Sequence, residues 1–441
     1  MHHYKLLTAA LLYFVLGGWL TAELGTVGSG LAILLTIGWL WVSEALHVSV
    51  TALLVPLLAA VSGVLAFDEA LLQFADPVIF LFLGGFALAA GLHRQGLDRW
   101  MAAWVISRAG NRLHRAARWL FWLTAGLSMW ISNTATAAMM LPLALGLLSP
   151  LSAERYRSTY LYVLLGVAFS ANIGGIGTLV GSPPNAIAAS NVGMDFAEWM
   201  LWGIPIVLVL MPLMEWALRL AFRPALDVAV EAPEVQFCWT YKHGLMLGVF
   251  SVAVLLWVFG APLGKALGVV KGYDAAVALL ALVALHTLGL ARWKDIEKSA
   301  DWGVLLLFGG GLTLSRVLGD SGAGAWLAGQ LAGPIEVMPA VVCVALMIVF
   351  ALILTEVASN TASAALLIPL FIGLAPEIDS QPMAVLVAVA TSCAFLLPVA
   401  TPPNAIVFGS GHVPQRAMIR GGLWVTAPAL LLMWAIAALT V

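Results

Sequence analysis

The feature that most constrains the fold is a polar motif that occurs twice inside hydrophobic sequence. The first copy reads SNTATAAMMLPLALGL from Ser132, and the second reads SNTASAALLIPLFIGL from Ser359. Each copy interrupts an apolar run with three small polar residues and then resumes as a helix-forming apolar run that contains a proline, Pro142 or Pro369. Such repetition predicts two structural units with the same order of elements.

Two further pairs of matching segments extend the repetition on either side of the motif. The segment GSPPNAI from Gly181 matches ATPPNAI from Ala400, and FLFLGGFALAAGL from Phe80 matches VLLLFGGGLTLSRVL from Val304. Nearly the same length of chain separates the members of each pair, and their order is the same in both halves. The chain is therefore an internal duplication.

Composition places this duplication in a membrane. The 441 residues are 62% hydrophobic and only 10% charged, and the mean hydropathy is +1.01. A soluble protein of this length cannot bury so much apolar surface. Apolar runs of about 20 residues, the length that crosses a hydrocarbon core, recur throughout the chain. We therefore predict an all-α polytopic membrane protein, and the net charge of −2 gives no indication of a nucleic-acid partner.

The apolar runs predict about 11 transmembrane helices, two of them broken at the Pro-Pro pairs. They are 6–22, 27–43, 48–67, 74–92, 159–192, 199–222, 245–260, 273–290, 302–318, 382–411 and 422–441. We expect four sections of chain. These sections are an N-terminal transmembrane helix (1–26), a first repeat (27–222), a polar cytoplasmic linker (223–243) and a second repeat (244–441).

Length and charge together predict that the Ser-Asn-Thr motifs are the tips of two re-entrant hairpins, 119–151 and 337–375. The arms of the first hairpin are too short for an untilted crossing, which needs about 20 residues. Both outer ends of the first hairpin are basic, whereas acidic residues flank the second. Because cytoplasmic loops retain lysine and arginine, we expect the first hairpin to enter from the cytoplasm and the second from outside.

The same rule places the N-terminus in the cytoplasm and the C-terminus outside. In this topology, all lysines and arginines lie on the cytoplasmic side except Lys265, Lys271 and Arg316. An odd number of predicted spans separates the starts of the two repeats, so the repeats have opposite orientations. Inverted repeats with broken helices that meet near the middle of the membrane are a known transporter architecture.

The two hairpin tips have the chemistry of an anion site. Non-helical backbone at membrane depth is tolerated where it is buried in protein or lines a wet cavity. Ser, Asn and Thr are good N-caps, and the free N–H groups and positive dipole end of the helix that follows attract anions. Two such tips related by a pseudo-two-fold axis suit a small molecule with two carboxylates.

A divalent anion at membrane depth needs compensating positive charge, and no lysine or arginine lies near either tip in the sequence. Oxygen atoms that suit Na⁺ are available instead. They belong to the side chains of Ser128, Asn133, Thr355 and Asn360 and to the backbone carbonyls at Gly181 and Ala400. Unwound carbonyls that coordinate Na⁺ beside helix N-termini are typical of inverted-repeat transporters.

Together these motifs resemble the divalent anion/Na⁺ symporter family, and within it the INDY-type bacterial Na⁺-coupled C4-dicarboxylate transporters. The resemblance covers essentially the whole chain, because the two SNT motifs and the SPPNAI and TPPNAI segments occur in the family's order. It implies a homodimer in the bacterial inner membrane, in contact with lipid, that imports succinate, malate or fumarate with Na⁺ by an elevator motion. A dicarboxylate exchanger, or a citrate or sulfate carrier, is the alternative within the family.

The resemblance also implies roles for individual residues. The substrate would contact Asn133, Thr134, Ser359, Asn360, Thr361, Thr401 and Pro402. One Na⁺ would be bound by Ser128, Ser132, Asn133 and the carbonyl of Gly181. The other would be bound by Thr355, Ser359, Asn360 and the carbonyl of Ala400.

An acidic residue, Glu356, lies three positions before Ser359, where the first half has Met129. An acid inside a membrane is a functional hypothesis by default. Glu356 is therefore interpreted either as a proton carrier, which favours H⁺ coupling, or as a structural acceptor within the second hairpin.

Other features have simpler interpretations. Gly84-Gly85 and 309–311 are expected to pack helices, because no P-loop lysine and serine follow them. An enzyme would need a nucleophile, a base or a metal cluster, and no histidine, cysteine or acidic cluster accompanies the tips. A channel is disfavoured because opposed closed hairpins favour alternating access.

Overall fold

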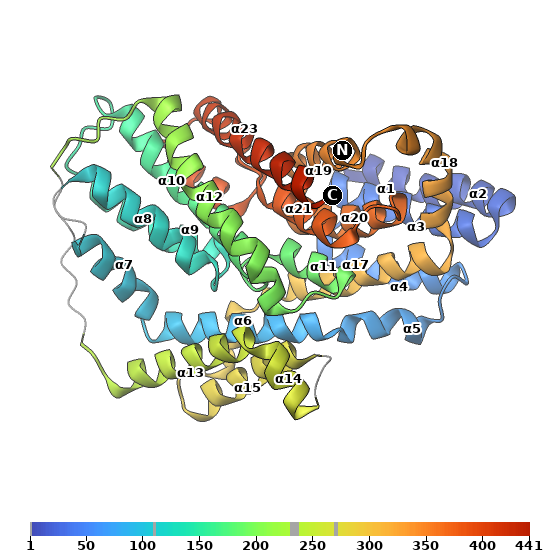
Figure 1. Ribbon diagram of the computed structural model, residues 1–441, viewed down its shortest axis with the longest axis horizontal. Helices are drawn as coiled ribbons and strands as arrows, with labels where there is room; N and C mark the ends of the chain where they lie inside the picture. The colour runs from blue at the N-terminus through green and yellow to red at the C-terminus, as the bar shows by residue number, and fades with distance from the viewer. Residues whose placement is uncertain (1, 109–111, 230–237, 269–271) are drawn as a thin grey trace.

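The computed structural model describes residues 2–108, 112–229, 238–268 and 272–441, and these residues are almost entirely helical (Figure 1). Nine helices in this part of the chain are long and apolar enough to cross a membrane. They are His3–Leu24, Thr26–Ser43, Phe67–Arg94, Arg157–Gly177, Phe196–Phe222, Tyr241–Val258, Trp302–Asp320, Ala340–Val357 and Gln415–Thr440. The prediction of an all-α polytopic membrane protein is confirmed.

The helix lengths differ from the prediction at two of the predicted spans. The segments 48–67 and 273–290 contain the shorter helices α4 (Val48–Val61) and α15 (Tyr273–Thr287), whereas 382–411 is broken as predicted and begins with α21 (Ser380–Ser392). Glycines just beyond α4 and α15, at 63 and 289, have positive φ and so terminate the helix while the sequence is still apolar. Conversely, the first arm of the second hairpin, Ala340–Val357, is long enough to cross.

The elements follow the same order in both halves. The first half contains α4, α5 (Phe67–Leu72), α6 (Pro77–Arg94), α7 (Leu97–Arg108), α8 (Leu113–Ser128), α9 (Asn133–Leu148), α10 (Arg157–Gly174), α11 (Pro183–Val192) and α12 (Phe196–Phe222). The second half contains α15, α16 (Trp293–Ser299), α17 (Trp302–Asp320), α18 (Ala323–Val337), α19 (Ala340–Val357), α20 (Asn360–Leu374), α21, α22 (Pro402–Gly409) and α23 (Gln415–Thr440). The duplication is thus repeated in the structure, element by element.

Packing between the halves is reciprocal, as a two-fold relation requires. Helix α4 packs on α17, and its counterpart α15 packs on α6. Helix α11 packs on α20, and α22 packs on α9. Outside this scheme lie α1 (His2–Leu11), α2 (Gly17–Leu24), α3 (Thr26–Ser43), α13 (Tyr241–Val258) and α14 (Gly260–Leu267). Of the predicted linker 223–243, residues 230–237 lie outside the described residues, as does Lys271.

Two helical hairpins, α8–α9 and α19–α20, pack on the most deeply buried helices of the fold. Nearly every residue of α10 and α21 is buried, and these two helices contact both arms of the first and second hairpin respectively. Figure 1 shows α8, α9 and α10 side by side, and the motif serines begin the second arm of each hairpin. The hairpin tips therefore rest against the breaks that follow α10 and α21.

Each break is stabilised by the asparagine of its Pro-Pro-Asn sequence. Asn185 Nδ2 donates to the carbonyl oxygens of Gly175 at 2.8 Å and Thr178 at 2.7 Å. Asn404 Nδ2 donates to the carbonyl oxygens of Ala394 and Leu397, both at 3.1 Å. These bonds satisfy carbonyls that the interrupted helices leave free in a buried place. The paired prolines lack N–H groups and begin α11 and α22 at positions that helices tolerate.

Glycines bring the helices of the two halves into close contact, as expected for the glycine motifs at 84–85 and 309–311. A Cβ atom on Gly84 would lie 2.6 Å from the carbonyl oxygen of Ala278. A Cβ atom on Gly310 would lie 2.7 Å from the carbonyl oxygen of Ala52. The α6–α15 and α4–α17 contacts therefore depend on residues without side chains.

We expect Gly84→Ala and Gly310→Ala to lower the thermal stability of the purified protein, because each methyl group must push two backbones apart. Overpacking of this kind costs about 1–3 kcal/mol. Gly248→Ala in α13 is the matched control, since a Cβ atom there meets nothing within 4 Å. Melting temperatures in detergent check the expectation, and equal values for all three variants would contradict it.

Candidate functional site

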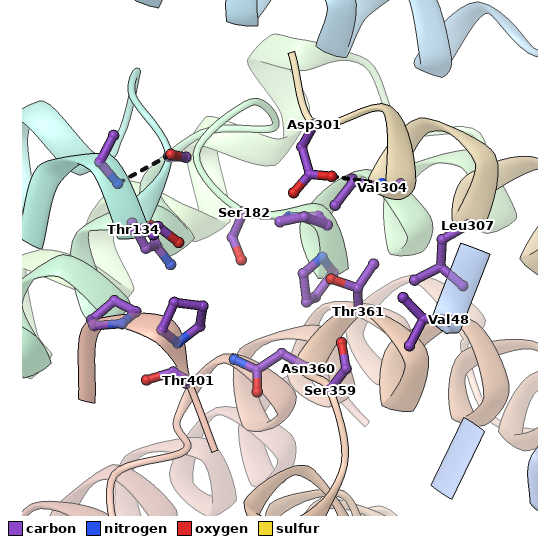
Figure 2. A pocket seen from close by; sticks show the side chains of 18 of the residues that line it. Val48, Thr134, Ser182, Asp301, Val304, Leu307, Ser359, Asn360, Thr361 and Thr401 are labelled. Carbon is purple, nitrogen blue, oxygen red and sulfur yellow. Dashed lines mark hydrogen bonds between the residues drawn. The ribbon is translucent and has the colours of Figure 1, made fainter. Parts of the chain in front are cut away.

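A cavity of 770 Å³ lies where the two hairpin tips meet the two helix breaks. Its walls include residues 132–134 and 359–361 from the tips and residues 181–184 and 399–403 from the breaks. Figure 2 shows Thr134 and Ser182 on one side of this cavity, with Asn360 and Thr401 on the opposite side. Segments that are more than two hundred residues apart in the chain thus form one site.

Four helices begin at this cavity. They are α9 and α20, which follow the hairpin tips, and α11 and α22, which follow the breaks. The positive end of each helix dipole therefore lies at the cavity. Because α11 and α22 begin with two prolines, the free first-turn N–H groups belong mainly to α9 and α20. This arrangement favours a bound anion.

All the residues that the sequence predicts to bind substrate line this one cavity. They are Asn133, Thr134, Ser359, Asn360, Thr361, Thr401 and Pro402. The lining residues that were not predicted include Ser182 and Pro183, the counterparts of Thr401 and Pro402, and Asn172, whose Nδ2 donates to Thr401 Oγ1 at 3.1 Å. The match between GSPPNAI and ATPPNAI could have indicated Ser182 and Pro183, because they occupy the positions of Thr401 and Pro402 in the other repeat. The binding role of all these residues stays a prediction.

Oxygen atoms cluster beneath the first tip. Ser128 Oγ lies 2.6 Å from the Asn133 amide oxygen and 2.7 Å from the carbonyl oxygen of Ala171. The same position on the Asn133 amide lies 3.2 Å from the carbonyl oxygens of Gly181 and Ala171. With its nitrogen in this position the Asn133 amide donates to these oxygens, and with its oxygen there it adds a fourth oxygen to the set. A hard cation suits such a set of oxygen atoms.

A second cluster with the same geometry lies beneath the other tip. Thr355 Oγ1 is 2.7 Å from Asn360 Oδ1 and 2.7 Å from the carbonyl oxygen of Thr391. The structure thus brings together Ser128, Asn133 and Gly181 in one half and Thr355 and Asn360 in the other.

The remaining predicted cation ligands are placed differently. Ser132 Oγ accepts the N–H of Ala135 at 3.3 Å and caps α9, while Ser359 and Ala400 line the cavity. Two carbonyls were missed by the sequence analysis, Ala171 and Thr391. Both carbonyls lie in the last turns of α10 and α21, just before the breaks. Their position beside a predicted break was the sequence signal that could have indicated them.

Ionisable side chains enter the cavity from segments far from the motifs. Among the described residues, Lys298 is the one lysine or arginine that lines it, together with Glu44, His47 and Asp301. The Asp301 carboxylate accepts the N–H of Val304 at 3.1 Å and caps α17, as Figure 2 shows. Lys298 belongs to no motif and lies far from both tips in the sequence, so its place in the cavity could not be predicted.

Glu356 lies outside the cavity and bonds to the second break. Its carboxylate oxygens accept the backbone N–H groups of Phe395, Leu396 and Leu397 at distances of 2.9–3.1 Å. In the first half the hydroxyl of Thr178 donates instead to the carbonyl oxygen of Met129. Glu356 therefore holds the extended segment between α21 and α22, which supports the structural interpretation of this residue.

Comparison with known proteins gives the same picture. A family profile described as "Citrate transporter" matches residues 39–391. An uncharacterized transporter of Haemophilus influenzae is 49% identical over 423 residues, which cover 93% of this chain and 91% of that protein. The sodium-dependent dicarboxylate transporter SdcS of Staphylococcus saprophyticus is 33% identical over 432 residues, which cover 90% of this chain and 82% of SdcS.

One solved structure shares the fold. It is the crystal structure of the Alcanivorax borkumensis YdaH transporter, described as having an unusual topology. The TM-score is 0.58 at 16% sequence identity, and the match covers 84% of this chain and 87% of that chain. At this identity the likeness concerns the fold alone.

We expect Glu356→Gln to lower thermal stability while the pH dependence of transport stays that of the wild-type protein. The amide nitrogen replaces an oxygen that accepts a backbone N–H, and a buried donor without a partner costs about 1–3 kcal/mol. Melting temperature and a pH profile of solute uptake are the measurements, with the exposed Glu297→Gln as control. A flattened pH profile with unchanged stability would instead identify Glu356 as a proton carrier.

Proposed function

Because this chain belongs to the citrate transporter family, we propose that it imports a C4-dicarboxylate such as succinate, malate or fumarate together with Na⁺. The observation that carries this proposal is the single cavity at which four helix N-termini meet, two from each half. The sodium-dependent dicarboxylate transporter SdcS, a relative over most of the chain, supports it.

The two-fold arrangement suits a substrate that carries a carboxylate at each end. One carboxylate would accept hydrogen bonds at the first tip, from Asn133, Thr134 and the N–H groups of α9. The other would do so at the second tip, from Asn360, Thr361 and the N–H groups of α20. Each carboxylate then faces the positive end of a helix dipole.

Na⁺ would supply the charge that the protein side chains do not. Lys298 is accompanied in the cavity by the carboxylates of Glu44 and Asp301, so these side chains offer a dianion no net positive charge. A cation at Ser128, Asn133, Ala171 and Gly181 would lie directly beneath the first tip. A cation at the second cluster would lie beneath the second tip. Substrate and cation would thus share Asn133 and Asn360, which couples their binding.

The resemblance supports the remaining parts of the proposal. They are a homodimer in the bacterial plasma membrane, a cytoplasmic N-terminus, an external C-terminus and alternating access by an elevator motion. Large apolar side chains on α19 are exposed, among them Leu346, Phe350 and Ile353, and these would contact lipid or a partner subunit.

Citrate is the second candidate substrate, because the matching family profile is described as a citrate transporter. Citrate carries a third carboxylate, which would have to lie away from both tips. Competition experiments therefore discriminate between the two substrates.

We expect purified protein in liposomes to take up labelled succinate when an inward Na⁺ gradient is imposed, and unlabelled malate or fumarate to compete better than citrate or sulfate. Asn133→Ala and Asn360→Ala should each reduce the initial rate by on the order of tenfold or more, since each removes a charge-assisted hydrogen bond. Intact uptake in both variants would show that the site assignment is wrong. Uptake that needs internal dicarboxylate but no Na⁺ gradient would identify an exchanger.

We also expect Ser128→Ala and Thr355→Ala to raise the Na⁺ concentration for half-maximal uptake by on the order of tenfold, since each loses one oxygen ligand. Thr124→Ala is the matched control. Thr124 is a buried hydroxyl one turn earlier in α8, and it donates to the carbonyl oxygen of Leu120 within its own helix. A Na⁺ requirement that is equal in all three variants would contradict the two cation sites.

A further inference from the structure

A second cavity, of 1030 Å³, adjoins the cavity between the tips. We call it the vestibule. The same side chains line both spaces at their boundary: Phe86, Ser132, Ala135, Ala138, Lys298 and Ser299. Beyond that boundary, the vestibule is formed by the C-terminal end of α6, the start of α7, one face of α9 and part of α16. It is therefore continuous with the cavity that we propose binds substrate.

Two cationic side chains in the vestibule have no ion-pair partner among the described residues. Arg99 lies on α7 and Lys298 on α16, and both are exposed. The other basic groups that line the vestibule each have an acidic partner. Arg94 pairs with Asp295, and His93 Nδ1 lies 2.7 Å from Asp98 Oδ2.

Arg94 shares the carboxylate of Asp295 with Arg292. The backbone N–H and guanidinium of Arg292, with help from Arg94, lower the pKa of Asp295 to about 2. The carboxylate therefore stays ionised and holds both arginines. One carboxylate offsets only one of the two guanidinium charges, so this cluster adds to the positive field of the unpaired Arg99 and Lys298.

The α9 wall of the vestibule provides little for a charged ligand. Its lining residues there include Ala135, Ala138, Met139, Pro142 and Leu143, which are apolar. An anion in this space would consequently be held at the rim, by the two unpaired cations. Exposed charges attract ligands over about 10 Å at 0.1 M salt, and such fields raise association rates.

We propose that the vestibule is a second, weaker anion site, at which Arg99 and Lys298 hold the dicarboxylate before it reaches the hairpin tips. The inference rests on the proposed function. Lys298 has the central part, since it lines both cavities and is the point at which the anion passes from one to the other. In the predicted topology the vestibule faces the cytoplasm, so it acts on substrate that enters or leaves on that side.

The test measures dicarboxylate exchange in proteoliposomes at saturating, equal Na⁺ on both sides, a reaction that needs access from both faces. Ionic strength is varied with choline chloride. The double variant Arg99→Gln/Lys298→Gln should have a kcat/KM on the order of three- to tenfold below wild type at low ionic strength, and the difference should disappear at high ionic strength. Lys298→Arg should restore most of the loss in the single Lys298→Gln variant, because it keeps the charge.

Lys294→Gln is the matched control, since Lys294 is an exposed lysine on the same helix that lines neither cavity. It should keep the wild-type kcat/KM and salt dependence, and Na⁺ half-saturation should be unchanged in every variant. A double variant with the wild-type salt dependence would overturn the vestibule site, whether or not its rate is lower. If the wild-type protein exchanges no dicarboxylate, the proposed function is at fault instead.

Discussion

The fold depends on keeping backbone polar groups satisfied at the four places where helices are interrupted inside the protein. In a membrane no bulk water is available to pair with a free carbonyl or N–H group. Asn185 and Asn404 supply the missing donors at the two breaks. These bonds fix the non-helical backbone of each break. As a result, α11 and α22 begin at the central cavity, and the hairpin tips pack against a backbone of defined conformation.

The two halves meet this constraint with different chemistry. In the second half an acidic side chain, Glu356, accepts three N–H groups of the break, whereas in the first half Thr178 donates to the carbonyl of Met129. In both copies the break donates and the first arm of the hairpin accepts, but a hydroxyl and a backbone carbonyl in the first half take the places of backbone N–H groups and a carboxylate in the second. The duplicated geometry has thus been kept while the residues that hold it have diverged, so a mismatch at one repeated position is no argument against the repeat.

The sequence was sufficient for the architecture and for the main residues of the hairpin tips and helix breaks that line the central cavity, because the duplication marks matching positions twice. It predicted both hairpins, both broken helices and every proposed substrate residue that lines the cavity. It could not show Lys298 or the Ala171 and Thr391 carbonyls, since these reach the site through tertiary packing and carry no motif. Helix ends were misjudged at α4 and α15, where a glycine with positive φ stops a helix within apolar sequence.

The two possible orientations of the Asn133 amide matter for the protein without a bound cation. Its amide oxygen can contribute to a cation site, and a half-turn of the same amide brings its nitrogen within 3.2 Å of three oxygens. When a cation leaves, the oxygens around it would otherwise repel one another in a buried place. The rotated amide offers them protons instead. In the proposed symport, in which the empty protein must return without cargo, Asn133 would be a cation ligand in the loaded state and a proton donor to the same oxygens in the empty one.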